Sequence, residues 1–498
     1  MKKLSNFSLD RRLSPEIQSE LLTSYIEKFI QKSSLRSLIN KLSEEFLIPE
    51  ENFEQDIKLF LLNNFKNSEG KFFSKFNLIY TFKSFFKNIA VYFWILINES
   101  SKNKEKLFFD IIVDDISHKN EIYRFKNFLK FFNKSLIISR VELDKKFNYY
   151  LFDRYKGLNL QNSLKNKKIK VLFYLIKVFF ISLKDRTNYC DIIFHLIRTI
   201  IKYESIFSSM IGDYLIQERH FTSSKLKCFI FKKYGGLKTT LFQRNIAQLN
   251  GPGMYSYSDL FFSLGNKTHL QYLKCKSNFE KIYPVGSFFM NSVKFDKKSN
   301  SQIPNFDLLH IASNMNYFQD GHVKFIDDWL EQFNWLKILN DKNPNLKICI
   351  KGRKGDGLKS NKKFTNLLKN SKLHFIDEHH EEKGTKDFDY NSSHSYDYAL
   401  NARVVCTWQS TMGFELLSLK KPCIFLDPGG RNTGHLPNDD YHNKIKVTDY
   451  NAFENLFFQI LNKKFKLDYL NTDDYCLESK NTHEKIFNIL INDKKNSK

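Results

Sequence analysis

The sequence predicts an α/β protein with parallel sheets behind a helical N-terminal segment. From about residue 106 onward, short apolar runs alternate with helical stretches, which is typical of parallel strands joined by right-handed crossovers. Residues 398–427 combine a strand, a Ser/Thr turn, a helix and a second strand within one short stretch. With 498 residues, of which 42% are hydrophobic, the chain is long enough for two or three domains with their own cores.

Residues 1–105 are expected to form a helical extension that packs on the rest of the chain. Ser14-Pro15-Glu16 is a helix start, with a capping residue, proline at the first helical position and then an acid. Further helical patterns cover 35–46, 53–64 and 82–96. No residue in this segment forms a pattern that indicates catalysis.

The first α/β unit is expected to cover residues 106–288. Strand-like runs occur at 107–113, 135–139, 149–152, 214–217, 238–242, 259–264 and 282–285. Asp114-Asp115 follows the first of these runs. Such an acidic pair either binds a cation or, as is more common, lies in a solvated turn or caps a helix.

The second unit is expected over residues 289–465, followed by a C-terminal helix and basic tail at 466–498. Its strand-like runs occur at 308–312, 346–350, 373–376, 403–407, 423–426 and 445–447. The tail is predicted to be helical near 482–491 and to end in a solvated basic segment.

The stretch between two of these strands carries the strongest functional pattern. Ser410 stands where a helix N-cap belongs, and Thr411 lies just inside the helix. Pro422 ends the helical pattern before the next strand. A hydroxyl pair at a helix start, beyond the carboxyl end of a parallel strand, is where α/β sheets bind phosphate. The alternative is that Ser410 only caps the helix.

The pattern S-T-x-G-x-E, a short helix and K-P-x-I-F-L-D resembles the C-terminal half of GT-B glycosyltransferases that build bacterial surface polysaccharide. More remotely, it is similar to CDP-glycerol glycerophosphotransferases, and the resemblance covers roughly residues 205–465. It implies two Rossmann-like domains, with the acceptor domain first and the nucleotide-donor domain second. It also implies that Ser410, Thr411 and Gly413 hold the diphosphate of the donor and that Glu415 meets the ribose.

Three further residues are candidates for the donor site. Lys351 and Arg353 lie in a basic, glycine-containing loop after a predicted strand, where their charges would meet a donor phosphate, or where the loop is simply solvated. Asn314 lies in the loop after the first strand of the second unit. The Gly/Pro-rich loop after Asp427 either closes over the donor or is an exposed connection.

The acceptor side is expected at the carboxyl ends of the strands in the first unit. Glu218 is the candidate base that deprotonates the acceptor hydroxyl, and His220 is its rival. Gln243 and Arg244 are placed on the acceptor side. Related transferases carry Gln-His-Gly where this chain has Gln-Arg-Asn, so the role of the family's histidine does not transfer.

Composition limits the partners. A formal net charge of +24 favours anionic lipid headgroups, nucleic acid or phosphorylated substrates. The lysines are spread along the chain and no nucleic-acid-binding motif occurs, so no nucleic-acid partner is expected. Residues 161–210 are apolar on one face with Lys and Arg on the other. They are a candidate contact for a membrane or a lipid-linked acceptor, or equally an ordinary core with a solvated face.

Several chemistries and locations are disfavoured by what the sequence lacks. No P-loop, G-x-G-x-x-G or G-x-S-x-G motif occurs, which argues against an NTPase, a dehydrogenase or a hydrolase of those types. His379-His380 has no third ligand at metal-binding spacing, so neither a metal nor a cofactor beyond the donor is expected. The apolar runs 89–97 and 171–183 fall short of the ~20 residues that span a bilayer. Both are predicted to be buried helices, with a membrane-surface helix as the alternative.

The seven cysteines are widely spaced, which suits buried thiols in a reducing cytosol. With no signal peptide, the expected location is the cytoplasm, with peripheral contact at the inner face of the cytoplasmic membrane.

Three functions remain open at this point. The favoured one is a glycosyltransferase-like enzyme that moves a sugar or polyol phosphate from a nucleotide-activated donor to a cell-surface glycan precursor. The second is a nucleotide-sugar epimerase of similar fold, which acts without an acceptor. The third is a non-catalytic basic protein that binds membrane or nucleic acid.

Overall fold

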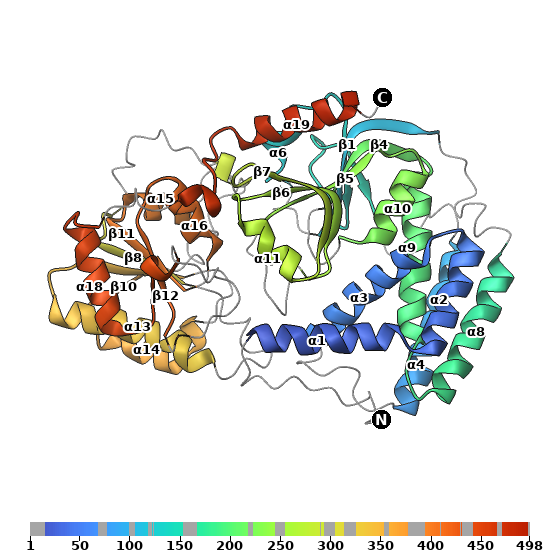
Figure 1. The fold of residues 1–498 in the computed structure, drawn as a ribbon, viewed down its shortest axis with the longest axis horizontal. Helices are drawn as coiled ribbons and strands as arrows, with labels where there is room; N and C mark the ends of the chain where they lie inside the picture. Colours follow the sequence, from blue (N-terminus) through green and yellow to red (C-terminus); the bar gives the residue numbers. More distant parts are fainter. Residues whose placement is uncertain are drawn as a thin grey trace.

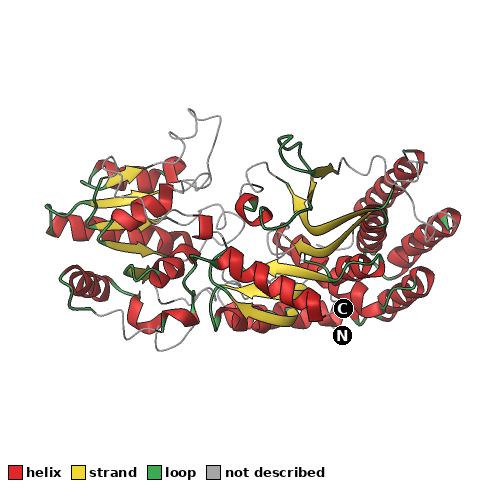
Figure 2. Ribbon diagram, turned by 90° about the horizontal axis from the view of Figure 1, so that it is seen from above, coloured by secondary structure: helices red, strands yellow, loops and turns green. Residues whose placement is uncertain are grey.

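The computed structural model contains two parallel sheets, each covered by helices, and a separate group of N-terminal helices (Figures 1 and 2). It describes residues 15–67, 77–98, 105–117, 122, 124–152, 167–217, 223–244, 254–288, 290–292, 304–312, 325–352, 358–376, 394–408, 410–428, 430, 442–465 and 471–496. The predicted α/β class is confirmed, as are the two Rossmann-like sheets and the helical N-terminal segment.

In Figure 1 the N-terminal helices extend from the lower middle of the picture, where the first of them lies, to its right-hand side. They are α1 (Pro15–Ile30), α2 (Ser33–Phe46), α3 (Glu50–Asn67) and α4 (Leu78–Ile97), and they pack with α8 (Lys168–Lys184) and α9 (Cys190–Phe207). Pro15 occupies the first helical position, as predicted. Because its own amide hydrogen is missing, proline removes only a bond that the first turn does not make.

The first sheet has seven parallel strands in the order β3-β2-β1-β4-β5-β6-β7. The strands are β1 (Leu107–Ile116), β2 (Ser135–Ser139), β3 (Tyr149–Leu151), β4 (Met210–Gln217), β5 (Lys238–Phe242), β6 (Tyr257–Ser263) and β7 (Asn278–Pro284). Chain order therefore runs outward from β1 to one edge, and then from β4 to the other.

Both faces of this sheet are covered. Ile112 of β1 belongs to a core shared with the N-terminal helices, α9 and α10 (Lys225–Lys233), whereas Ile111 and Val113 belong to a core on the opposite face. That second core includes α6 (Lys126–Leu129) and α19 (Thr482–Asn496), and α11 (Thr268–Lys274) packs against β7. The alternation follows from the two-residue period of a strand, and burial on both faces explains the apolar strand sequences.

The second sheet has six parallel strands in the order β10-β9-β8-β11-β12-β13. They are β8 (Leu308–Ile311), β9 (Ile348–Lys351), β10 (His374–Ile376), β11 (Val404–Thr407), β12 (Cys423–Leu426) and β13 (Lys446–Val447). One core lies under α13 (Phe325–Lys342), α14 (Lys362–Lys369) and α18 (Tyr450–Leu461), and the other under α15 (His394–Asn401), α16 (Thr411–Ser418) and α17 (His442–Ile445). Short 3-10 turns occur at η2 (Met290–Ser292), η3 (Leu358–Ser360) and η6 (Thr472–Asp474).

The C-terminal segment returns to the first sheet, where α19 lies along the top of Figure 1. The Tyr214 hydroxyl of β4 donates to the carbonyl of Leu490 at 2.6 Å, and Lys238 of β5 pairs with Asp493 at 2.5 Å. Lys494 pairs with Asp213. Lys494 of the predicted basic tail is therefore paired with a protein acid, whereas the neighbouring Lys495 is exposed.

The predicted burial of the apolar run 89–97 holds for one side of the helix only, where Tyr92 and Ile95 are buried. Phe93 is 44% exposed and Ile97 is 80% exposed, so one side of α4 faces outward. No helix in the described ranges combines the length and apolarity that crossing a bilayer requires. All seven cysteines are buried and free, as predicted.

Candidate functional site

The second sheet reverses its strand order between β8 and β11, and the residues of the strongest sequence pattern lie at this point. The Thr407 hydroxyl at the end of β11 donates to the carbonyl of Ile311 at the end of β8, at 2.9 Å. Helix α16 begins four residues after Thr407. In open α/β sheets, ligands bind outside the carboxyl ends of the strands at such a reversal, because the two neighbouring loops diverge there.

Ser410 and Thr411 form the start of α16. Ser410 has an extended backbone (φ −85°, ψ 129°), and its hydroxyl accepts a hydrogen bond from the Met412 amide at 3.3 Å. Ser410 therefore caps α16, as one of the two alternatives for this residue predicted. Both residues are half-buried. The amide and hydroxyl of Thr411 have no hydrogen-bond partner among the residues that the structure describes, which leaves them available to an anion.

Lys351 is the last residue of β9 and is 1% exposed. Its ammonium lies 5.3 Å from the ring centre of Tyr398 in α15. Cys349, two residues earlier, belongs to the core under α15 and α16, so Lys351 lies on the same face of the sheet as α16. The structure thus places a buried cation on the face and at the edge where α16 starts. The flexible, solvated alternative does not apply to Lys351.

Gly413 has a packing role in this fold. A Cβ atom at this position would lie 2.6 and 2.8 Å from two ring atoms of Phe425 and 3.1 Å from the Cys423 sulfur. The glycine therefore allows α16 to lie close to β12. This close approach of helix and strand brings the start of α16 to the sheet edge.

Glu415 is fully enclosed, and both of its carboxylate oxygens are engaged by protein groups. Ser287, which follows the last strand of the first sheet, donates to Oε1 at 2.5 Å, and the Tyr396 hydroxyl donates to Oε2. Burial raises the pKa of Glu415 above its ordinary value, and these two hydrogen bonds oppose the shift. The carboxylate thus joins the two units of the chain, which is a different set of partners from the ribose that the sequence resemblance implies.

The chain between the units is tightly packed beside this contact. Gly286 has φ +96°, and a Cβ atom there would lie 2.9 Å from both the Leu477 carbonyl and the Ser479 hydroxyl. The amide of Ser287 donates to the same Ser479 hydroxyl at 2.8 Å. Residues 286–287, between the two sheets, therefore contact residues 477–479 of the C-terminal segment. This contact lies next to Glu415.

The first sheet reverses its strand order between β1 and β4, and a charged cluster fills that point. Asp114 of β1 is fully buried and binds the Lys227 ammonium at 2.7 Å and the Tyr203 hydroxyl at 3.0 Å. Burial raises the pKa of Asp114, but the charges of Lys227 and Lys202 outweigh it, so the pKa lies below its ordinary value.

Asp115, the other acid of the pair, receives two hydrogen bonds from Arg140, at 2.5 and 2.7 Å. Its backbone is left-handed, with φ +68°. The solvated turn or cap expected for Asp114-Asp115 is therefore wrong, because protein cations neutralise both acids within the fold. Nothing in the sequence spacing linked them to Arg140 or Lys227.

The structure describes Gln243 and Arg244 of the acceptor-side candidates. Glu218 and His220 follow β4 directly in the sequence and lie outside the described residues, as do Asn314 and Arg353 of the donor side. Gln243 is buried, and its side-chain oxygen accepts from the Leu264 amide at 2.9 Å and the Thr268 hydroxyl at 2.8 Å. It therefore fixes the loop after β6.

Arg244 follows Gln243 after the end of β5 and is half-buried. Among the described residues, no group of three or more His, Cys, Asp or Glu side chains is arranged to hold a metal ion. His379 and His380 lie outside the described residues.

Comparisons with known proteins place these features in context. No protein-family model matches the sequence, and a search of curated proteins finds no match. Among solved structures, the chain is similar to the wall teichoic acid polymerase TagF with bound CDPG, at 9% identity and a TM-score of 0.45, covering 84% of this chain and 99% of that one.

Two other solved structures are also similar. UDP-GlcNAc 2-epimerase from Neisseria meningitidis, bound to UDP-GlcNAc, has 11% identity and a TM-score of 0.44, covering 78% of this chain and all 100% of that one. The lipopolysaccharide outer core galactosyltransferase WaaB has 12% identity and a TM-score of 0.40, with coverage of 78% and 100%. These likenesses concern the fold alone, so the function is argued from the geometry of the site.

Proposed function

We propose that this protein is a GT-B-type transferase that moves a sugar or polyol phosphate from a nucleotide-activated donor to a cell-surface glycan precursor. The observation that carries the proposal is the start of α16 at the strand-order reversal of the second sheet. There Ser410 caps α16 and Thr411, also half-buried, is its first residue, so the first amides of the helix lack the partners that amides farther along a helix have.

The leaving diphosphate needs positive charge and hydrogen-bond donors that are already in place before the reaction. In this proposal, the Thr411 amide and hydroxyl bind the phosphate oxygens, and the α16 dipole adds a partial positive charge. Lys351, buried on the same face, contributes a full positive charge in a low-dielectric setting. Arg353 and Asn314 remain candidates for further donor contacts.

The acceptor hydroxyl requires a base from the first unit. Glu218 remains the proposed base and His220 its rival, because both follow β4, the strand that borders the order reversal of the first sheet. In this proposal, the base removes the acceptor proton as the new bond forms, while the start of α16 holds the donor phosphates. Transfer of a sugar breaks the bond between its anomeric carbon and the diphosphate and releases a nucleoside diphosphate. Transfer of a polyol phosphate breaks the bond between the two phosphates and releases a nucleoside monophosphate.

The backbone amide of Thr411 is tested by replacing Thr411 with proline. Proline is compatible with the first helical position and lacks the amide hydrogen. Ser410 already has the extended backbone that a residue before proline adopts. We expect UDP, CDP, GDP or CMP to raise the melting temperature of the wild type and to have a greatly reduced effect on Thr411→Pro.

Lys362→Pro is the matched control. Lys362 is the first residue of α14, and its capping residue, Asn361, is likewise extended, with ψ 112°. This variant makes the same change at another helix start in the same unit, and it should keep the full nucleotide effect. A wild type that no nucleotide stabilises, or equal losses in both variants, would contradict the proposed donor site.

The kind of reaction is then tested with the nucleotide-linked donor that binds. A transferase releases nucleotide only after an acceptor glycan is added. An epimerase converts the donor alone, and a non-catalytic protein leaves it unchanged. Nucleotide release that depends on the acceptor is the outcome that we expect.

A further inference from the structure

In the first half of helix α4, polar side chains are turned inward and several aromatic side chains are turned outward, whereas Tyr92 and Ile95 in the second half are buried. Thr81, Ser84 and Asn88 are buried, whereas Phe86, on the opposite side of the helix, is 61% exposed. Other large apolar residues on the outer side are Ile79, Phe82, Phe93 and Ile97. An ordinary surface helix has the reverse arrangement, so this orientation needs a cause.

A half-buried acid on α9 holds α4 in this orientation. The carboxylate of Asp191 accepts hydrogen bonds from the Ser84 hydroxyl at 2.5 Å and from the Asn88 amide at 3.0 Å. Farther along the helix, the Tyr92 hydroxyl donates to the carbonyl of Lys168 in α8 at 3.0 Å. These polar contacts fix the rotation of α4 about its axis, and the aromatic side therefore faces away from the protein.

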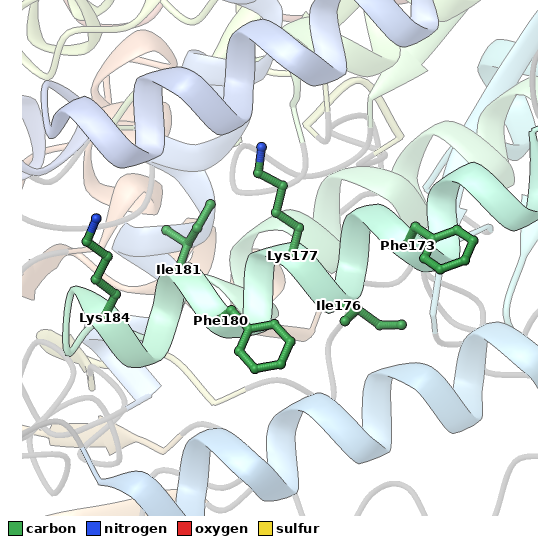
Figure 3. Close-up of a pocket in the computed structure, with 6 residues that line it drawn as sticks. All are labelled: Phe173, Ile176, Lys177, Phe180, Ile181 and Lys184. Carbon is green, nitrogen blue, oxygen red and sulfur yellow. The ribbon is translucent and has the colours of Figure 1, made fainter.

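The neighbouring helix α8 continues the same surface. Its outer side forms a shallow groove lined by Phe173, Ile176, Lys177, Phe180, Ile181 and Lys184 (Figure 3). Phe173 and Phe180 are 67% and 62% exposed. Aromatic contacts connect the two helices, because the rings of Phe82 and Phe179 are 4.9 Å apart and that of Phe179 lies 5.7 Å from Phe180.

The charges on this surface have a single sign. Neither α4 nor α8 contains an aspartate or glutamate. Together they carry six lysines: Lys83 and Lys87 on α4, and Lys168, Lys170, Lys177 and Lys184 on α8. Exposed aromatic and aliphatic residues interspersed with lysines suit the boundary between lipid headgroups and acyl chains.

We propose that the outer faces of α4 and α8 dock this protein on an anionic lipid bilayer. The apolar side chains enter the headgroup region, and the lysines meet the lipid phosphates. A second copy of the chain is a poor occupant, because it would place lysines opposite lysines across the apolar contact. The proposal does not depend on the proposed transferase reaction, since neither helix contributes to the start of α16.

The test uses the purified full-length protein and two kinds of vesicle. One kind contains phosphatidylcholine alone, and the other contains phosphatidylcholine mixed with phosphatidylglycerol. We expect the wild type to co-sediment with the mixed vesicles only, and to bind them less strongly as salt is raised. Failure of the wild type to bind the mixed vesicles would overturn the proposal.

Two triple variants separate the apolar and electrostatic contributions. Phe86→Ser, Phe173→Ser and Phe180→Ser together should weaken partitioning at least about a hundredfold, because three exposed aromatic rings no longer enter the bilayer. Lys83→Gln, Lys87→Gln and Lys177→Gln together should weaken it roughly fivefold per lysine. Unchanged binding in both triple variants would overturn the proposal.

Matched controls replace exposed residues elsewhere. Leu270→Ser, Leu273→Ser and Ile338→Ser remove exposed apolar side chains from α11 and α13, and Lys362→Gln, Lys363→Gln and Lys369→Gln neutralise α14. Both controls should bind the mixed vesicles as the wild type does, and losses equal to those of the test variants would overturn the proposal. Nucleotide stabilisation without lipid should be the same in all these variants, so a failed docking surface is distinguishable from a failed donor site.

Hydrogen exchange on the wild type provides a readout that needs no variant. Mixed vesicles should slow amide exchange in residues 78–97 and 168–184. Protection in other segments alone would contradict docking through α4 and α8. A wild-type dimer that becomes monomeric in the Phe→Ser triple variant, without vesicle binding, would assign the surface to self-association instead.

Discussion

The two sheets share a topology but differ in what occupies the point where strand order reverses. In the first sheet, between β1 and β4, Asp114 and Asp115 are bound by Lys227, Tyr203 and Arg140. In the second sheet, between β8 and β11, α16 begins with the half-buried Ser410 and Thr411, and the described groups leave the Thr411 amide open.

The difference indicates which edge is available to an anion. Protein groups already neutralise the described charges of the first reversal point, so it acts as an internal support for the loops around it. The second reversal point has a helix start and a buried lysine on one face, with no acid among the side chains described as contacting Ser410 or Thr411. The same fold therefore has an edge filled by protein charges in one unit and, in the other, the edge where we propose that an anion binds.

The largest loss of stability is expected when the buried Asp114 at the strand-order reversal of the first sheet is replaced. Asp114→Asn leaves the Lys227 ammonium, itself 1% exposed, without the opposing charge, so we expect a loss of about 3–5 kcal/mol in unfolding free energy. Urea denaturation measures this loss. The double variant Asp114→Asn with Lys227→Met should recover much of it, since the buried charge is then also removed. A single variant as stable as the wild type would show that the pair does not support this edge.

A loss of stability at low pH is expected from a buried histidine in α19, which covers part of the first sheet. Burial lowers the pKa of His483 at the start of α19 to about 4, and its Nε2 lies 2.9 Å from the Phe288 carbonyl. Since the unfolded chain binds the proton more tightly, stability is present above pH ~6.5 and is lost as pH falls toward 4, by on the order of 3 kcal/mol. His483→Gln should reduce the slope of unfolding free energy against pH in that window. An unchanged slope would contradict the buried neutral imidazole.

A smaller effect is expected at the open edge. Gly413→Ala places a methyl group against the Phe425 ring, so we expect a loss of about 1–3 kcal/mol in unfolding free energy. Asn366→Ala at an exposed position of α14 serves as the control and should be close to neutral. The nucleotide-induced rise in melting temperature, measured from each variant's own baseline, should persist in Gly413→Ala. Its selective loss would instead place Gly413 in contact with the donor.

The smallest effect is expected at the contact between the units. Because burial raises the pKa of Glu415, the folded protein holds this proton more tightly than the unfolded chain does. The stability that it contributes is therefore lost as pH rises from about 4.5 through the folded-state pKa. Glu415→Gln should remove this decline of unfolding free energy with rising pH. The measurement is the unfolding free energy of both proteins from acidic to neutral pH. A decline equal to that of the wild type would mean that Glu415 is ionised in the fold.

Local patterns in the sequence predicted local structure well. The β-branched run before Thr407, the capping Ser410 and the helix-ending Pro422 defined β11, α16 and β12 nearly as the structure has them. Each of these signals acts within a few residues, through capping, propensity or loss of an amide hydrogen.

Contacts between distant residues could not be predicted in the same way. Asp191 lies more than a hundred residues after Ser84, so the reversed orientation of α4 has no local signal. The same holds for Glu415 with Ser287 and for Asp114 with Lys227. A carboxylate in a helix or after a strand has the same sequence pattern whether it meets a ligand or a partner from elsewhere in the chain.

In the proposed function, the diphosphate of a nucleotide binds at the start of α16. The most direct test is a crystal structure of the protein with the nucleoside diphosphate that stabilises it most. We predict phosphate oxygens within hydrogen-bond distance of the Thr411 amide, on the face of the second sheet where Lys351 lies. A diphosphate bound elsewhere, with the Thr411 amide turned away from it, would contradict the account.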